Sequence, residues 1–179
     1  MLQNKIAVVT GGTRGIGYAI VQKFLQNGAK VVLFGSREET VVKAVASLKE
    51  ENPDWDVSGA WPKLTDAAAM ADAIAKIKEK YGRIDILVNN AGGYPKEIYK
   101  NIEHQAIKIW EWSEEQWDQI IKTNLRIPFL VTKNVVPVMI KQGKGDIVNV
   151  SSRMGRIASQ MGAYAVAKGG IVTMTKTTA

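Results

Sequence analysis

The stretch that most constrains the fold is residues 5–25, KIAVVTGGTRGIGYAIVQKFL, in which an apolar run meets a glycine-rich turn. Residues 6–9 are continuously apolar, which is typical of a strand that is covered on both faces. The positions after the turn recur with the period of a helix and predict one face of it: Ile16, Ala19, Ile20, Lys23 and Phe24. The segment therefore predicts a buried parallel strand that leads through a turn into a helix.

The turn itself, residues 11–17, predicts a phosphate-binding site. Its glycines give the spacing G-x-x-x-G-x-G rather than the common G-x-G-x-x-G. Because glycine has no side chain, the backbone can turn tightly and approach a ligand. The helix that follows directs free N–H groups and its positive dipole end at the turn, where a pyrophosphate binds well. A turn that only connects two elements is the alternative, and the missing Gly-Lys-Ser/Thr excludes a P-loop.

Composition narrows the function classes. The 179 residues suit one domain. The absence of cysteine excludes disulfides, thiolate nucleophiles and cysteine-bound zinc, and one histidine, His104, cannot form a histidine metal cluster. We therefore expect no metal site, and we expect His104 to lie at the surface. No run is apolar enough to span a membrane and the first residues resemble no secretory signal, so we expect a cytoplasmic protein.

The net charge of +7 raises the question of nucleic-acid binding. The lysines are scattered singly or in pairs along helical segments, as on solvated helix faces. We therefore expect no nucleic-acid partner, although DNA retention that depends strongly on salt would revive that reading.

Strand and helix patterns alternate along the chain. Further strands are predicted at residues 30–34, 57–61, 84–89 and 146–150, and further helices at 38–51 and 67–80. In the helix at 67–80, one face carries Met70, Ile74 and Ile77. This alternation predicts an α/β fold of the Rossmann type, a doubly wound parallel sheet with helices on both faces.

The residues after the second strand bear on the choice of cofactor. Gly35, Ser36 and Arg37 stand where the adenosine ribose of a dinucleotide lies in this architecture. A carboxylate would bind a free 2′-hydroxyl, whereas a hydroxyl and a guanidinium favour a 2′-phosphate, hence NADP over NAD. Arg14 could supply a second cation. The alternative is that Arg37 starts a helix and pairs with Glu38 or Glu39.

Two later segments leave alternatives open. Residues 94–112 are rich in aromatic and apolar positions that suggest a short amphipathic helix, which could line a substrate pocket or serve packing or a subunit contact. Ser113 and Gln116 form a capping box that opens a long helix. Within that helix Pro128 has no N–H, so the carbonyl of Asn124 loses its helical partner and becomes a polar anchor, or the helix is simply kinked.

Tyr164 and Lys168 are the candidate catalytic pair. A spacing of four residues places them one above the other on a helix face. An ammonium about 4 Å away, in an effective dielectric of about 20, stabilises a phenolate by about 4 kcal/mol. Ser152 follows the last predicted strand and could hold a substrate oxygen while Tyr164 gives or takes its proton. Taken alone, Y-x-x-x-K is common on helices.

Together these motifs resemble the short-chain dehydrogenase/reductase family. They are TGGTRGIG at 10–17, NNAG at 89–92, Asn124, Ser152 and YAVAK at 164–168. The resemblance spans essentially the whole chain and implies NAD(P)-dependent hydride transfer between nicotinamide and a carbonyl or secondary alcohol, with hydroxysteroids and 3-oxoacyl thioesters as examples. It implies a catalytic tetrad of Asn124, Ser152, Tyr164 and Lys168.

The resemblance also implies roles for each site residue. Tyr164 is the proton donor or acceptor, Lys168 assists it and binds the nicotinamide ribose, Ser152 positions the carbonyl, and Asn124 holds a water that leads to Lys168. Tyr164 is implied to bind the cofactor together with Lys168. The further cofactor-binding residues that the resemblance implies are Gly11, Gly12, Thr13, Arg14, Ile16, Ser36, Arg37, Leu64 and Asn90. Asn90 would lie near the adenosine ribose. Family members usually pair through the helices that carry Asn124 and Tyr164, so a homodimer or homotetramer is expected.

Three departures from the family pattern qualify these expectations. Lys63 replaces the usual aspartate beside the adenine, and the interval between Gly92 and Asn124 is longer than usual. The chain stops at Ala179, before the family's last strands, so we expect a single NAD(P)-binding domain over residues 1–179 that is incomplete at its C-terminus. The fifth strand would then be an exposed edge. The alternative function is an inactive, truncated dinucleotide-binding module.

Overall fold

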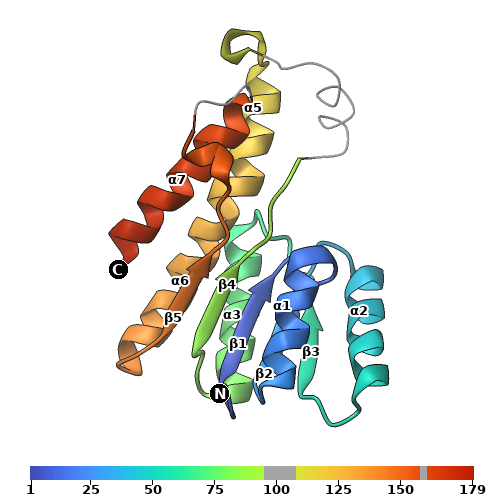
Figure 1. The fold of residues 1–179 in the computed structure, drawn as a ribbon. Helices are drawn as coiled ribbons and strands as arrows, with labels where there is room; N and C mark the ends of the chain where they lie inside the picture. Colours follow the sequence, from blue (N-terminus) through green and yellow to red (C-terminus); the bar gives the residue numbers. More distant parts are fainter. Residues whose placement is uncertain (95–107, 158–160) are drawn as a thin grey trace. The chain divides into compact units, whose positions relative to one another are not determined.

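The computed structural model describes residues 1–94, 108–157 and 161–179 (Figure 1). Most of the aromatic-rich segment predicted to contain a short helix, together with His104, lies outside the described residues. The chain divides into two compact units. The first unit consists of Met1–Ala91 and Leu130–Val148, and the second of Gly92–Phe129 and Asn149–Ala179. We describe each by itself, and the single domain expected from the sequence stays a prediction.

The elements follow the predicted alternation. In chain order they are β1 (Ile6–Thr10), α1 (Gly15–Gln26), β2 (Lys30–Phe34), α2 (Glu38–Glu51), β3 (Val57–Ala60), α3 (Ala67–Tyr81), β4 (Ile86–Asn89), η1 (Ile109–Glu111), α5 (Glu114–Ile121), η2 (Lys122–Arg126), α6 (Ile127–Lys141), β5 (Asp146–Asn149), η3 (Arg153–Gly155) and α7 (Gly162–Thr178). The strands at β2 and the helix at α2 have the predicted bounds. β3 and β5 each end one residue early, and β4 begins two residues late.

The strands form one five-stranded sheet in the order β3-β2-β1-β4-β5, which confirms the predicted Rossmann-type topology. The pairs that β1 makes with β2 and β4 are parallel, as is the pair between β2 and β3. β1 is buried along its whole length, as its continuous apolar run predicts. β5 stands last in the strand order and its residues are half-buried or exposed, so it is the edge strand that the sequence predicts.

Helices of the first unit cover opposite faces of the sheet. A Cβ placed on Gly59 of β3 would meet Val41 and Val45, so α2 packs on the face to which Gly59 belongs. Ser58 and Ala60, the neighbours of Gly59 in β3, line a groove with α3 on the other face. The predicted inner face of α3 is confirmed, because Met70, Ile74 and Ile77 are buried.

The predicted face of α1 is wrong in phase. The buried residues of α1 are Gly17, Val21 and Leu25, whereas Ile16 is 68% exposed. The cause is Gly17, whose Cα lies against the carbonyl oxygen of Gly11 and must therefore face inward. The residues that recur with Gly17 at helical spacing are then the ones that pack on the sheet.

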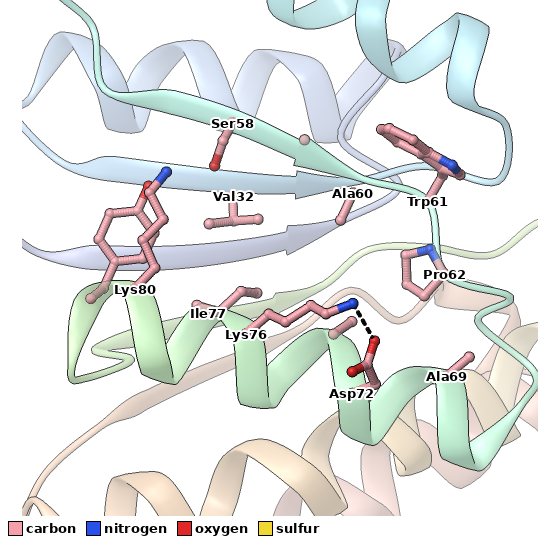
Figure 2. A pocket seen from close by; sticks show the side chains of 13 residues that line it. Val32, Ser58, Ala60, Trp61, Pro62, Ala69, Asp72, Lys76, Ile77 and Lys80 are labelled. Carbon is pink, nitrogen blue, oxygen red and sulfur yellow. Dashed lines mark ion pairs between the residues drawn. The ribbon is translucent and has the colours of Figure 1, made fainter.

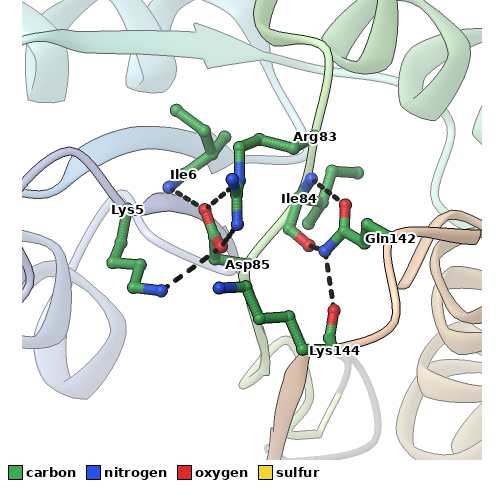
Figure 3. Close-up of polar contacts among 7 residues, drawn as sticks. All are labelled: Lys5, Ile6, Arg83, Ile84, Asp85, Gln142 and Lys144. Carbon is green, nitrogen blue, oxygen red and sulfur yellow. Dashed lines mark hydrogen bonds and ion pairs between the residues drawn. The ribbon is translucent and has the colours of Figure 1, made fainter. Parts of the chain in front are cut away.

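Asp85 anchors the start of the sheet in the first unit (Figure 3). Asp85 is 3% exposed as a whole residue. Its carboxylate accepts a hydrogen bond from the backbone N–H of Ile6 at 2.9 Å and pairs with Arg83 and Lys5. Burial acts to raise the pKa of Asp85, but the hydrogen bonds from Arg83 and Ile6 and the two positive charges outweigh it and lower the pKa. The ionised carboxylate is therefore the form that stabilises the fold.

Gln142 makes a second anchor beside it. The side-chain amide of Gln142 accepts from the N–H of Ile84 at 3.2 Å and donates to the carbonyl oxygens of Ile84 and Lys144, at 2.6 and 2.8 Å (Figure 3). One side chain thus bonds to the backbone of Ile84 in the way that a neighbouring strand would. This contact ties the segment after α6 to the segment before β4.

We expect the Asp85→Asn variant to lose about 3 kcal/mol in its free energy of unfolding at neutral pH, because Arg83 loses its buried partner. Because the pKa of Asp85 is lowered in the folded state, this stabilisation is present above the unfolded pKa of about 3.9. It is lost as the pH falls through the folded pKa. Urea unfolding of wild type and variant between neutral and acidic pH should therefore show a difference that shrinks on the acid side.

The matched control is Asp72→Asn, which breaks the exposed pair between Asp72 and Lys76 on α3. Exposed pairs of this kind contribute about 0.5 kcal/mol or less. Equal losses for the Asp85 and Asp72 variants would contradict the anchoring role of Asp85.

The second unit is built from helices. Ser113 and Gln116 form the predicted capping box at the start of α5, and each contributes one hydrogen bond of 3.2 Å. Between α5 and α6 the helix widens into a π-turn, η2, which contains Asn124. Pro128 follows directly, and its missing N–H leaves the carbonyl of Asn124 without an α-helical partner. The sequence predicted this disruption, but not that it takes the form of a π-turn.

An aromatic cluster forms the core of the second unit. Two buried residues, Ile120 of α5 and Ala163 of α7, lie at its centre. Four half-buried aromatic side chains pack against them: Tyr94, Trp112, Trp117 and Tyr164.

Within the part of the chain that the structure describes, no helix is long and apolar enough to cross a membrane.

Candidate active site

The glycine turn of the first unit is fastened to the end of β4 by Asn90. The side-chain nitrogen of Asn90 donates to the carbonyl oxygens of Thr10 and Gly11, at 3.1 and 3.2 Å. The hydroxyl oxygen of Thr10 accepts from the backbone N–H groups of Asn90 and Ala91, each at 3.0 Å. A Cβ on Gly17 would lie 2.1 Å from the oxygen of Gly11 and 2.5 Å from that same nitrogen of Asn90. The turn thus lies against Asn90, and a glycine is required at position 17.

The outer side of the turn fits a dinucleotide phosphate. Gly15 has a φ of +55°, and a Cβ at this position would find no atom within 4 Å. Arg14 and Ile16 are exposed beside it, and Arg14 makes no capping hydrogen bond at the start of α1. Open space, a free helix N-terminus and an exposed guanidinium are the features that bind a pyrophosphate. Of the five residues predicted to hold this group, Gly12 is buried and its N–H donates to the carbonyl oxygen of Phe34 at 3.0 Å. Gly11, Thr13, Arg14 and Ile16 would hold it.

The remaining residues predicted to bind the cofactor lie elsewhere on the first unit. Ser36 and Arg37 are exposed after β2, and Arg37 is the residue that precedes α2. The neighbouring Gly35 is buried, with Thr13 of the turn against its Cα. Leu64 is half-buried in the segment after β3.

A groove lies on the α3 face of the sheet (Figure 2). It has a volume of about 510 Å³ and runs between β3 and α3. Trp61, 44% exposed, stands at one end. Its lysines already have partners, because Lys76 pairs with Asp72 at 2.8 Å and Lys80 lies over the ring of Tyr81. None of the predicted site residues lines this groove.

In the second unit, Gly92 brings Asn124 and Lys168 together. A Cβ on Gly92 would lie 2.8 Å from Oδ1 of Asn124 and 3.3 Å from Nζ of Lys168. The side-chain amide of Asn124 is fully buried and bonds to both backbone polar groups of Gly93, the residue after Gly92. Oδ1 accepts from the N–H of Gly93 at 2.7 Å, and Nδ2 donates to its carbonyl oxygen at 2.8 Å. The glycine of NNAG is thus the contact point for two of the predicted catalytic residues.

Lys168 is a buried cation beside Tyr164. Lys168 is 4% exposed, and its Nζ donates to the carbonyl oxygen of Val150 at 2.9 Å. Burial lowers the pKa of Lys168. The same Nζ lies 5.7 Å from the centre of the Tyr164 ring. A positive charge at this range, shielded from water, stabilises negative charge on the phenol. The predicted pair therefore lies together, as the four-residue spacing on a helix requires.

Ser152 is held against the same helix. The hydroxyl of its neighbour Ser151 donates to the carbonyl oxygen of Lys168 at 2.8 Å. The hydroxyl oxygen of Ser152 accepts from the N–H of Met154 at 3.2 Å, and η3 begins there. The backbone of Gly155 then packs on the backbone of α7 at Lys168 and Gly169. All four residues predicted to be catalytic thus belong to the second unit.

Comparison with known proteins identifies the family. A model of the short chain dehydrogenase family matches residues 5–179. The chain belongs to the short chain dehydrogenase family. This family of oxidoreductases includes a 3alpha-hydroxysteroid dehydrogenase of Mediterraneibacter gnavus, which is 40% identical over 180 residues that cover 100% of this chain and 68% of the relative. It also includes a 3-oxoacyl-acyl-carrier-protein reductase of Thermotoga maritima, which is 39% identical over a match that covers 98% of this chain and 67% of the relative.

Solved structures of short chain dehydrogenases share the fold. A metagenomic short-chain oxidoreductase in complex with NADP is 29% identical, with a TM-score of 0.85, over 98% of this chain and 75% of that one. An NAD⁺-bound xylitol dehydrogenase is 26% identical, with a TM-score of 0.87, over 98% of this chain and 64% of the xylitol dehydrogenase chain. Relatives thus bind either cofactor. This chain spans about two thirds of the length of the curated relatives it matches.

Sequence reasoning missed one aromatic neighbour of Tyr164, one of the four residues predicted to be catalytic. The ring of Tyr94 stacks on the ring of Tyr164, with 4.9 Å between centroids and 28° between planes. The sequence placed Tyr94 only within an aromatic-rich segment. The one available signal was its position directly after NNAG-Gly, two residues beyond the glycine that contacts Asn124 and Lys168.

Proposed function

We propose that this short chain dehydrogenase is an NADP-dependent oxidoreductase that interconverts a carbonyl and a secondary alcohol on a hydroxysteroid-type substrate. The observation that carries the proposal is the contact of two buried residues, Asn124 and Lys168, within the second unit. Asn124 and Lys168 meet at Gly92, and the ammonium of Lys168 lies beside the ring of Tyr164. A phenol supported by a buried cation is suited to giving and taking a proton at neutral pH.

The bound dinucleotide supplies the hydride, and the residues of this chain supply the proton and the orientation. In the reducing direction, Tyr164 gives its hydroxyl proton to the substrate oxygen as that oxygen gains negative charge. Lys168 stabilises the phenolate that remains, and Ser152 holds the substrate oxygen by a hydrogen bond. Asn124 fixes the Gly93 backbone, and its own carbonyl, left without an α-helical partner, is suited to bind a water that returns a proton toward Lys168.

Two features support a hydroxysteroid-type substrate. The relative from Mediterraneibacter gnavus is named a 3alpha-hydroxysteroid dehydrogenase. Tyr94 stacks on Tyr164, and Trp112 and Trp117 belong to the same aromatic cluster, whose apolar character suits a flat hydrocarbon skeleton. A 3-oxoacyl thioester is the second substrate class, supported by the reductase of Thermotoga maritima. Activity with ketosteroids and NADPH, compared with 3-oxoacyl thioesters, tests the choice.

The preference for NADP over NAD rests on Ser36, Arg37 and Arg14. Both arginines are exposed, one after β2 and one in the glycine turn, where they could bind a 2′-phosphate. We expect Arg37→Glu to weaken NADPH binding about 30- to 150-fold, since one charged hydrogen bond contributes about 2–3 kcal/mol. NADH binding should tighten, because a carboxylate can accept from the free 2′-hydroxyl. Calorimetric titration with both dinucleotides measures the two changes.

Lys43→Glu is the matched control, because Lys43 is exposed on α2, the helix that Arg37 precedes, and the variant has the same change in charge. It should leave both affinities nearly unaltered, since exposed charges are screened beyond about 10 Å. If Arg37→Glu binds both dinucleotides as wild type does, Arg37 only starts α2 and the case for NADP fails.

A dinucleotide-binding module without turnover is the second candidate, because the glycine turn belongs to the first unit, which contains none of the four residues predicted to be catalytic. NADPH binding by calorimetry, with no oxidation across a broad panel of carbonyls, would establish it. We also propose a homodimer or homotetramer, a single domain over residues 1–179 and a cytoplasmic location. Sedimentation of the purified chain tests the first of these.

A further inference from the structure

Tyr94 is attached to the candidate active site at both of its ends. Its backbone follows Gly93, which the Asn124 amide grips through two hydrogen bonds of 2.7 and 2.8 Å. Its hydroxyl donates to the carbonyl oxygen of Met161 at 3.4 Å. That same oxygen accepts the backbone N–H of Tyr164 at 3.0 Å. The side chain of Tyr94 is therefore fixed relative to the first turn of α7.

The ring of Tyr94 occupies one face of the Tyr164 ring. The centroids lie 4.9 Å apart and the planes are inclined by 28°, which is a stacked arrangement. Behind the pair lie the buried Ile120 and Ala163 and the indole of Trp117. A stacked neighbour that is itself held in place restricts the tilt of the phenol and keeps water from that face.

We propose that Tyr94 is a positioning residue that sets the orientation of the Tyr164 phenol, and that Asn124 acts on Tyr164 through Gly93 and Tyr94. This inference rests on the function proposed above. It gives the Asn124 side chain a task that is separate from the task of its backbone carbonyl. Tyr94 itself transfers no proton.

The pKa of Tyr94 agrees with a role in positioning Tyr164 rather than in proton transfer. Burial, and then the negative charge of an ionised Tyr164, raise the pKa of Tyr94. Tyr94 therefore stays neutral while its partner gains or loses a proton. Lys168 faces the other partner, with its Nζ 5.7 Å from the centre of the Tyr164 ring.

The test compares Tyr94→Leu, which removes the stack, with Tyr94→Phe, which keeps the ring and loses only the long hydrogen bond to Met161. We expect Tyr94→Leu to lower kcat about 10- to 100-fold, because small misplacements of a reacting group have effects of this size. Its KM should change far less. The pH profile of kcat should also differ from that of wild type, because the stack no longer covers that face of the Tyr164 ring. We expect Tyr94→Phe to stay within about threefold of wild type.

A folded Tyr94→Leu with the kcat and pH profile of wild type would overturn the inference. A wild-type protein that reduces no carbonyl would instead overturn the proposed function, and a second measurement then decides the role of Tyr94. Ultraviolet absorbance follows phenol ionisation without cofactor, and the difference between wild type and Tyr164→Phe reports Tyr164 alone. That difference curve should move in the Tyr94→Leu background and stay in place in the Tyr94→Phe background. An unmoved curve in the Leu background would also refute the inference.

Discussion

The Tyr164→Phe variant is expected to lose turnover about 100- to 10,000-fold, the range that general acid–base catalysis contributes. The substitution removes one hydroxyl and leaves the ring, so the stack with Tyr94 and the backbone bond to Met161 remain. The cation of Lys168 then has no phenolate to stabilise. Because the ring of Tyr164 and the ammonium of Lys168 remain and the glycine turn is unaltered, NADPH affinity should stay within about threefold of wild type.

Steady-state kinetics with NADPH and a ketosteroid measure the loss, and calorimetry measures the binding. Tyr81→Phe is the matched control, since it removes a phenol hydroxyl that bonds to Asp56 in the first unit. It should keep the turnover of wild type. Substantial residual activity in Tyr164→Phe, with Tyr81→Phe as reference, would assign the proton transfer to another group.

The Gly17→Ala variant is the second large effect that we expect. The added Cβ would lie 2.1 Å from the oxygen of Gly11 and 2.5 Å from Nδ2 of Asn90, distances at which the backbone must move. Overpacking of this kind costs about 1–3 kcal/mol in the free energy of unfolding. The displaced turn should also lose its N–H groups as ligands for phosphate, so NADPH affinity should fall at least about 100-fold.

The Gly15→Ala variant measures backbone strain in the same turn without a steric clash. Gly15 has a φ of +55° and open space around its missing Cβ, so alanine there incurs about 1–2 kcal/mol of strain without a collision. Urea unfolding without ligand should therefore rank the variants with Gly17→Ala as the less stable. Unfolding and NADPH binding like those of wild type in Gly17→Ala would refute the close approach of α1 to the turn.

The sequence predicted the fold well because the informative patterns were local. Continuous apolar runs identified β1 and β2, and the alternation of strands and helices fixed a parallel sheet. The phase of α1 was beyond this reasoning, because an apolar residue at 16 fits a helical period while the required contact of Gly17 lies across the turn. Local periodicity cannot show which residue a distant backbone will touch.

The candidate site was predictable to the same degree. The spacing of Tyr164 and Lys168 and the missing N–H of Pro128 both follow from helix geometry, and the structure has the corresponding pair and the disrupted helix. The stack of Tyr94 on Tyr164 joins residues 70 positions apart, and the contact of Gly92 with Asn124 depends on a loop. Such contacts arise from packing, and no single-sequence pattern specifies them. The roles of the site residues stay predictions.

The most direct test of the account follows the hydride itself. Purified protein is incubated with a ketosteroid and NADPH that carries deuterium at the transferring carbon of the nicotinamide, on each face in turn. Mass spectrometry then examines the alcohol product. The account predicts that one of the two labelled cofactors delivers its deuterium to the carbinol carbon. Alcohol that forms without the label from either cofactor, or no alcohol at all while NADPH binds, would contradict it.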